Sequence, residues 1–159
     1  MKVDYAHTFP YLYDPSGQDR QPLLPLDLVH PDAWNSRIAV DGYLDSGCSR
    51  SLFDGRLALA IGLDPTRGRS IPYTSTTGVS IRATLVKVCL EHPALGTFDL
   101  EAGFSQINLT RNLLGRDFLA LVQLGFRENR LEFYLKREPS MAAEKLIAAS
   151  GETPADRKI

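Results

Sequence analysis

Residues 43–49 read Tyr43-Leu44-Asp45-Ser46-Gly47-Cys48-Ser49. The acid Asp45 directly follows an apolar segment and precedes a small hydroxyl residue and a glycine, Ser46 and Gly47. This order is typical of a tight turn at the end of a buried strand, where burial perturbs the pKa of a carboxyl group. The same triplet type also occurs in ordinary turns, in which the acid or the hydroxyl bonds its own backbone. Its meaning therefore depends on the rest of the chain.

The segments around the triplet predict mostly strands. Loose alternation of apolar and polar residues, β-branched residues and turn signals about every ten residues are typical of short antiparallel strands. The predicted strands are residues 23–29, 37–44, 70–75, 79–90, 97–104, 122–126 and 131–135, with residues 31–36 as the first connection. Short helices are predicted at residues 51–61, before Gly62, and at residues 116–123. This pattern predicts an all-β fold with a closed sheet and one or two short helices.

Two further segments stand at suitable distances from the triplet. Thr76-Thr77-Gly78 lies between two predicted strands and has the composition of a hairpin tip that needs a glycine backbone. Leu113-Leu114-Gly115, followed by Arg116, places two apolar residues and a glycine before the second predicted helix. Each segment alone is common in structural roles. Their order after Asp45 is what gives the triplet more weight.

At these residues the chain resembles the retropepsin-like aspartic proteases, in particular the solitary single-domain members found in bacteria. The resemblance covers about residues 22–135 and implies a closed barrel or sandwich. It implies that Asp45 binds the catalytic water, that Ser46 braces two subunits and that Gly47 keeps the loop close to substrate. It also implies that Thr76, Thr77 and Gly78 form the substrate-binding flap, and that Leu113, Leu114 and Gly115 support the catalytic loop.

The chain departs from the family pattern at three places. Cys48 stands where the family usually has alanine, and Ser49 stands where several viral members have an acid that pairs with the Arg116 position. The hairpin tip has one glycine rather than several. Turn signals and composition add a lead-in at residues 1–21 and a helical or disordered tail at residues 138–159 on either side of the expected protease domain at residues 22–137.

A single triplet implies two chains for this chemistry. Peptide hydrolysis by aspartates needs two carboxylates that share one proton. The chain of 159 residues offers one such triplet and is about half the length of a two-lobed enzyme. We therefore expect an aspartic endopeptidase that acts on peptide or protein substrates as a symmetric homodimer, with Asp45 of each copy near the twofold axis.

Composition limits the other partners. The chain has 18 basic and 19 acidic residues and a net charge of -1, so no strong field attracts nucleic acid or an anionic membrane. No apolar run approaches the roughly 20 residues of a membrane-spanning helix, and no secretory signal is visible. The sequence predicts a cytoplasmic protein. Cys48 and Cys89 lack the spacing of a disulfide framework or a zinc site, and His7, His30 and His92 stand near prolines in turn-like sequence. We expect reduced thiols, solvated histidines, no metal and no cofactor.

Two other functions remain open at this point. A non-catalytic binding or dimerisation module would keep the fold and its cleft without activity, because fold alone does not establish function. Such a module has no chemical need for an acid at Asp45. A cysteine hydrolase would use Cys48 with a histidine as its base, but nothing in the sequence marks His7, His30 or His92 as that partner.

Overall fold

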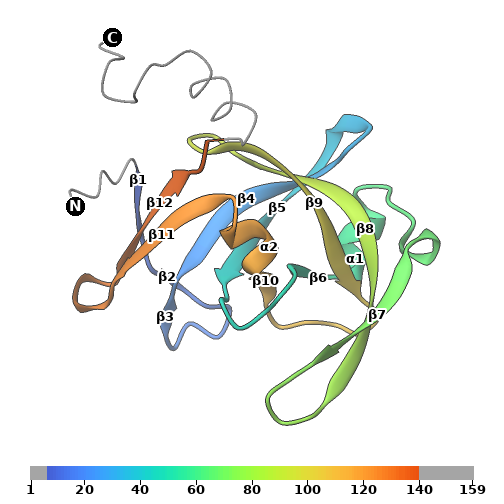
Figure 1. Cartoon of the computed structure of the whole chain (residues 1–159), viewed down its shortest axis with the longest axis horizontal. Helices are drawn as coiled ribbons and strands as arrows, with labels where there is room; N and C mark the ends of the chain where they lie inside the picture. Colours follow the sequence, from blue (N-terminus) through green and yellow to red (C-terminus); the bar gives the residue numbers. More distant parts are fainter. Residues whose placement is uncertain (1–6, 140–159) are drawn as a thin grey trace, which may run out of the picture.

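A seven-stranded sheet forms the body of the computed structural model, which describes residues 7–139 (Figure 1). Its strands follow the order β4, β5, β10, β6, β9, β8 and β7, and β4 also pairs with β8, which closes the sheet into a barrel. The bounds are β4 Leu23–His30, β5 Ala33–Leu44, β10 Asn112–Leu114, β6 Leu52–Asp54, β9 Gly96–Ser105, β8 Ser80–His92 and β7 Arg69–Thr74. The prediction of an all-β fold with a closed sheet is confirmed.

Strand β8 divides its edge between two partners. Its residues 80–85 pair with β7, and Cys89, Leu90 and Glu91 pair with β4. Because β4 pairs with only the second half of β8, β7 pairs with the same edge over the first half, and the tip of the β7–β8 hairpin, drawn in green in Figure 1, projects from the barrel. This is the hairpin predicted around residues 76–78.

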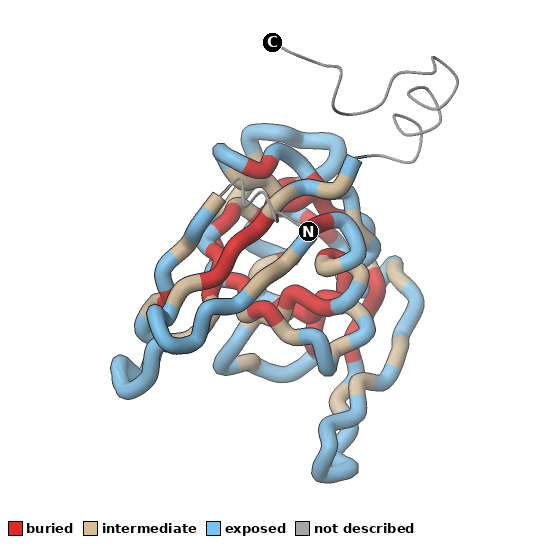
Figure 2. The backbone as a smooth tube through the Cα atoms, turned by 60° about the vertical axis from the view of Figure 1, so that its left-hand side comes forward, coloured by how far each residue is buried: buried red, intermediate tan, exposed pale blue. Residues whose placement is uncertain are grey.

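The core follows from the two-residue period of the strands. Leu24, Leu26 and Leu28 of β4 project to one face and belong to the central apolar cluster. The rings of Phe98 and Phe118 meet edge to face there, with centroids 5.0 Å apart. Burial of each large apolar side chain contributes roughly 1.5–3 kcal/mol relative to exposure. Figure 2 shows these buried segments in the middle of the molecule and exposed turns around them.

A second, three-stranded sheet joins the two ends of the described chain. Its order is β1, β12 and β11, with bounds β1 His7–Pro10, β12 Glu132–Arg137 and β11 Val122–Arg127. Phe9 of β1 stacks on Phe133 of β12 with ring centroids 5.3 Å apart. Between β1 and the barrel, β2 Leu12–Tyr13 and β3 Arg20–Gln21 form a small hairpin. The N-terminal segment from His7 onwards therefore packs on the rest of the chain.

The helices are shorter than the sequence predicts. Helix α1 covers Gly55–Ala60 and α2 covers Arg116–Leu119, with 3-10 turns η1 at Pro65–Arg67 and η2 at Glu128–Arg130. The prediction of a helix from residue 51 is wrong in its first half, because residues 52–54 are buried and form β6 between β9 and β10. Tertiary pairing overrides the local helical spacing. Likewise, the helix predicted to reach residue 123 ends at Leu119, and β11 begins at Val122.

Two smaller expectations are also corrected. Strand β5 begins at Ala33, inside the predicted connection, because the β4–β5 pairing shifts register between Val29 and His30 and continues to Ala33. The histidines are not solvated loop residues: His7 opens β1, His30 ends β4 and His92 ends β8, each partly buried.

No helix within residues 7–139 is long and apolar enough to cross a membrane. The predicted tail lies outside the described residues from residue 140 onwards.

Candidate active site

Asp45 stands immediately after β5, in a turn that its own carboxylate organises. The backbone N–H of Gly47 donates to Asp45 Oδ1 at 2.9 Å, and the N–H of Cys48 donates to the Asp45 carbonyl at 3.2 Å. The side chain is partly exposed. The turn thus presents the second carboxylate oxygen outward while the first is held by the backbone.

Strand β10 supports this turn from the side. It runs parallel to the end of β5, with Leu113 beside Tyr43 and Leu114 beside Leu44. The pairing continues one step further, because the N–H of Asp45 donates to the carbonyl of Leu114 at 3.0 Å. The predicted supporting segment is therefore a direct backbone neighbour of the candidate catalytic residue.

Gly115 lets the two segments approach closely. A Cβ at this position would lie 2.7 Å from the backbone carbon of Arg50 and 2.8 Å from the carbonyl oxygen of Cys48. The next residue, Arg116, donates its N–H to that same Cys48 carbonyl at 2.8 Å. A side chain at Gly115 would push the supporting segment away from the Asp45 loop.

A buried polar network locks the loop to α2. Asp117 Oδ1 accepts from both the N–H and the hydroxyl of Ser51 at 2.8 Å, and the N–H of Gly115 donates to Ser51 Oγ at 3.1 Å. Ser51 is fully buried. Asp117 Oδ2 is also buried and has no hydrogen-bond partner among the described residues. Asp117 Oδ1 also accepts from the N–H of Phe118, so the two side chains satisfy three backbone donors and one hydroxyl.

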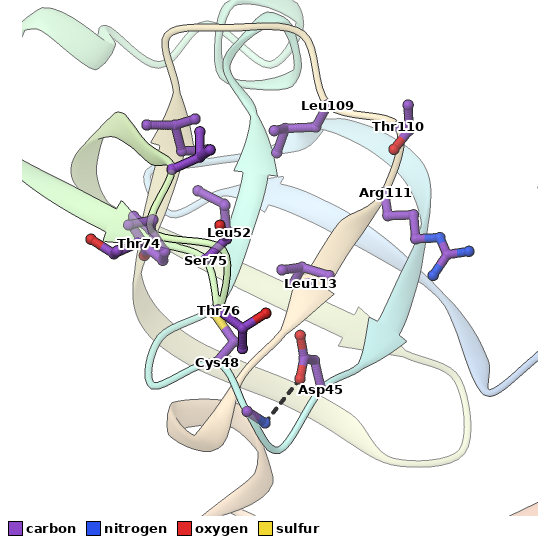
Figure 3. A pocket seen from close by; sticks show the side chains of 14 residues that line it. Asp45, Cys48, Leu52, Thr74, Ser75, Thr76, Leu109, Thr110, Arg111 and Leu113 are labelled. Atoms are coloured by element: carbon purple, nitrogen blue, oxygen red, sulfur yellow. Dashed lines mark hydrogen bonds between the residues drawn. The ribbon is translucent and has the colours of Figure 1, made fainter.

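A pocket of about 510 Å³ opens above Asp45 (Figure 3). One wall is the segment from Leu109 to Leu113, and the opposite wall comes from the β7–β8 hairpin. The lining residues are Asp45, Gly47, Cys48, Leu52, Tyr73, Thr74, Ser75, Thr76, Val79, Ile81, Leu109, Thr110, Arg111 and Leu113. The pocket therefore combines a carboxylate with a mainly apolar and hydroxyl-bearing surface.

The hairpin over the pocket has a glycine at its tip, as the sequence predicts. Gly78 has φ +82, a left-handed conformation that costs other residues energy, and its N–H donates to the Ser75 carbonyl at 3.0 Å. At the base, the Tyr73 hydroxyl donates to the Ser51 carbonyl at 3.1 Å. Val79 is 63% exposed, so the tip offers an apolar side chain to solvent.

The predicted site residues divide into two groups. Asp45, Gly47, Thr76 and Leu113 line the pocket. The remaining five are not among the described lining residues: Ser46, Thr77, Gly78, Leu114 and Gly115. Ser46 is exposed beside the pocket. Its predicted role as a brace between subunits stays a prediction.

Sequence reasoning missed several residues that shape the pocket. Tyr73 and Arg111 line it, and the Ser51–Asp117 pair holds the backbone of Gly115 beside the Asp45 loop. Sequence order could have indicated Ser51 and Asp117, since each is a short polar residue that closely follows a motif: Ser51 follows the Asp45 triplet, and Asp117 follows Leu113-Leu114-Gly115. Arg111 had no comparable signal, because its position follows from the loop between β9 and β10. Among residues 7–139, Arg116 forms no ion pair.

Cys48 lies in the pocket but lacks the properties of a nucleophile. Burial raises the pKa of the Cys48 thiol, and the carboxylates of Asp45 and Asp117 add to the effect. The thiol also donates to the Arg50 carbonyl at 2.8 Å. A raised pKa reduces the thiolate that a cysteine hydrolase needs, so the geometry gives that alternative no support. Within residues 7–139, no group of three or more His, Cys, Asp or Glu side chains is arranged to hold a metal.

The chain is similar to known proteins in its three-dimensional structure. No family model matches the chain, and no curated protein matches it. A retropepsin-like aspartic protease from Rickettsia conorii is similar in structure, with a TM-score of 0.53 and 14% identity over 82% of this chain and 99% of that one. EIAV protease in complex with the inhibitor HBY-793 also matches, with a TM-score of 0.47 and 15% identity over 65% and 88% of the two chains. The chain has the fold of the retropepsin-like aspartic proteases.

Proposed function

We propose that the protein is an aspartic endopeptidase in which Asp45 from each of two identical chains acts on one water molecule. The observation that carries this proposal is the position of Asp45. Its turn is held by β10, and its carboxylate faces a pocket beneath a projecting hairpin. Among the described lining residues it is the one acid. A pure binding module would have no chemical use for a carboxylate at this point.

The chemistry requires a second carboxylate. One ionised carboxylate takes a proton from water as the water oxygen attacks the scissile carbonyl, while the other, protonated, donates a hydrogen bond to the carbonyl oxygen. The C–N bond then breaks as a proton passes to the amide nitrogen. Like charges at about 3 Å cannot both ionise, so the pair shares one proton and titrates as a unit. A homodimer is the simplest source of the second Asp45.

The hairpin and the pocket suit an extended peptide. Strand β7 ends the order of the seven-stranded sheet, so its outer edge has backbone groups that an added strand can pair with. Leu52, Ile81 and Leu113 supply apolar lining for alternate side chains of such a peptide. We therefore propose peptide segments in extended conformation, from unfolded or flexible proteins, as the substrate class.

Cleavage of a denatured protein and of a peptide library, at mildly acidic and neutral pH, tests the proposal. The Asp45→Asn variant keeps the size of the side chain and removes its charge, so it should lose cleavage while retaining the wild-type melting temperature. Asp41→Asn, an exposed change on the same strand, is the matched control. A transition-state inhibitor of aspartic proteases should block the wild type. Wild-type protein that binds peptides without cutting them would support the binding module instead.

A further inference from the structure

Arg111 is an unusual member of the pocket wall. Of the fourteen described lining residues, two are charged: Asp45 and Arg111. Figure 3 shows Leu109, Thr110, Arg111 and Leu113 in succession along one wall that leads down towards Asp45. The other lining side chains are apolar, hydroxyl-bearing or small. Arg111 is therefore the one described lining residue that can attract a negatively charged group of a bound molecule.

The segment that carries Arg111 is firmly anchored. Asp54 Oδ2 accepts from the N–H of Leu109 at 2.9 Å, and the Asn112 side chain accepts from the N–H of Asp54 at 3.0 Å. Asp54 is buried. These hydrogen bonds on both sides of Arg111 limit how far its backbone can move. The position from which its side chain extends is therefore fixed.

The guanidinium of Arg111 already contacts one carboxylate. It lies 5.2 Å from the centre of the Tyr43 ring and 3.5 Å from Asp14 Oδ2, in the turn between β2 and β3. Asp14 is held by its own turn, where Ser16 donates a hydrogen bond to its Oδ1. The contact at 3.5 Å is long for a charged hydrogen bond, which is commonly near 2.8 Å. The side chain of Arg111 remains 42% exposed.

These contacts leave much of the guanidinium available. A guanidinium carries several N–H donors in a planar fork suited to carboxylates, and among the described residues one hydrogen bond from Arg111 is present. The Tyr43 ring supports one face of the group without using its donors. These unused donors belong to a residue that lines the pocket.

We propose that Arg111 forms a subsite that selects an acidic side chain of the peptide, with Asp14 and Tyr43 as the residues that position its guanidinium. The inference rests on the proposed function for the reaction itself, and it adds a substrate preference at one position. A glutamate or aspartate would accept charge-assisted hydrogen bonds from Arg111, whereas a lysine at the same place would be repelled.

A set of matched peptides tests this subsite. In a peptide that the protein cleaves, each residue flanking the cut bond is replaced in turn by Glu, Gln or Lys, and kcat/KM is measured. At one position the wild type should favour Glu over Gln by about three- to tenfold, a preference that weakens at high salt. Arg111→Gln should bring that ratio close to one, and Arg111→Glu should favour Lys. Arg82→Gln removes an exposed charge from β8 outside the pocket lining and should leave the ratio unchanged.

Binding measurements separate this inference from the reaction. The anisotropy of the same labelled peptides on the Asp45→Asn variant should show tighter binding of the Glu peptide, lost when Arg111→Gln is added. If no peptide is cleaved but this pattern holds, the proposed reaction fails and the subsite stands. Equal rates and equal affinities for Glu and Gln at every position, or a Glu preference that survives Arg111→Gln, would overturn the subsite.

Discussion

The backbone N–H of Asp45 donates a hydrogen bond of 3.0 Å to the carbonyl of Leu114. Through this bond, two residues 69 positions apart in the sequence become neighbours, where β5 and β10 pair in parallel. The position of the Asp45 carboxylate relative to the other pocket residues therefore depends on how closely β10 can approach β5. That dependence makes the residues around Leu114 sensitive positions for activity.

Gly115→Ala tests the close approach of the two segments. The new methyl group would meet the backbone of Arg50 at 2.7 Å, so the supporting segment must move. We expect a loss of about 1–3 kcal/mol in the free energy of unfolding, as for other overpacked positions, and a marked fall in kcat. Urea unfolding and peptide cleavage measure the two effects. Unchanged stability and unchanged kcat would show that the backbones are not packed as described.

Asp117 tests the polar network behind the loop. Asp117→Ala leaves the buried Ser51 hydroxyl and N–H without their shared acceptor, which should cost about 1–3 kcal/mol. Asp117→Asn retains an oxygen at the position of Oδ1 and should recover most of that loss. Chemical denaturation of the two variants gives the comparison. An Asn variant as unstable as the Ala variant would contradict the assigned hydrogen bonds.

The stability of the protein should also depend on the charge of Asp54. Hydrogen bonds from Arg56, followed by the backbone N–H of Leu109, hold the pKa of Asp54 well below its usual range. A carboxyl group with a lowered folded pKa stabilises the fold above its unfolded pKa of about 3.9, and this contribution disappears as pH falls towards the folded pKa.

Asp54→Asn should therefore destabilise the protein near neutral pH, by about 1–2 kcal/mol for a buried and hydrogen-bonded charge. The gap between variant and wild type should close as the pH is lowered from about 5 towards 2. Thermal unfolding across this pH range measures it, with Asp41→Asn as the exposed control. A gap that stays constant with pH would exclude Asp54 as the responsible charge.

Cys48 should behave as a partly buried thiol of low reactivity. Because its pKa is raised, the thiolate is scarce at pH 7 and alkylation by iodoacetamide should be slow, becoming faster at alkaline pH. Once attached, the added group should block cleavage, since Cys48 lines the pocket. Cys48→Ala should remain active and resist this inhibition. An inactive Cys48→Ala variant beside an active Asp45→Asn variant would revive the cysteine hydrolase.

Local sequence patterns predicted much of this fold because they act over short distances. Alternation in β4 and the glycine at the tip of the β7–β8 hairpin both specify local structure, and both were predicted correctly. Residues 52–54 were misread as helix, since their strand depends on pairing with β9 and β10. No local pattern encodes such partners. The same reason explains why α2 ends earlier than its sequence suggests.

In the candidate site, too, contacts between residues far apart in the sequence could not be predicted from local patterns. The motif around Asp45 and the Leu113–Gly115 segment could be found from residue order alone, and the structure brings them into contact. Arg111 and Asp14 could not be paired from the sequence, because the β2–β3 hairpin reaches the pocket rim only in the folded chain. Tyr73 likewise enters the pocket through the geometry of its hairpin.

Mixed dimers test the need for two Asp45 residues most directly. Wild-type protein at fixed concentration is equilibrated with a ninefold excess of Asp45→Asn protein, or of Asp41→Asn protein as the active control, and peptide cleavage is measured. With random pairing, about one wild-type chain in ten keeps a wild-type partner, so activity should fall to about one-tenth with Asp45→Asn and rise with Asp41→Asn. Activity that stays at the wild-type level in the presence of excess Asp45→Asn would mean that one Asp45 is sufficient, and would contradict the shared active site.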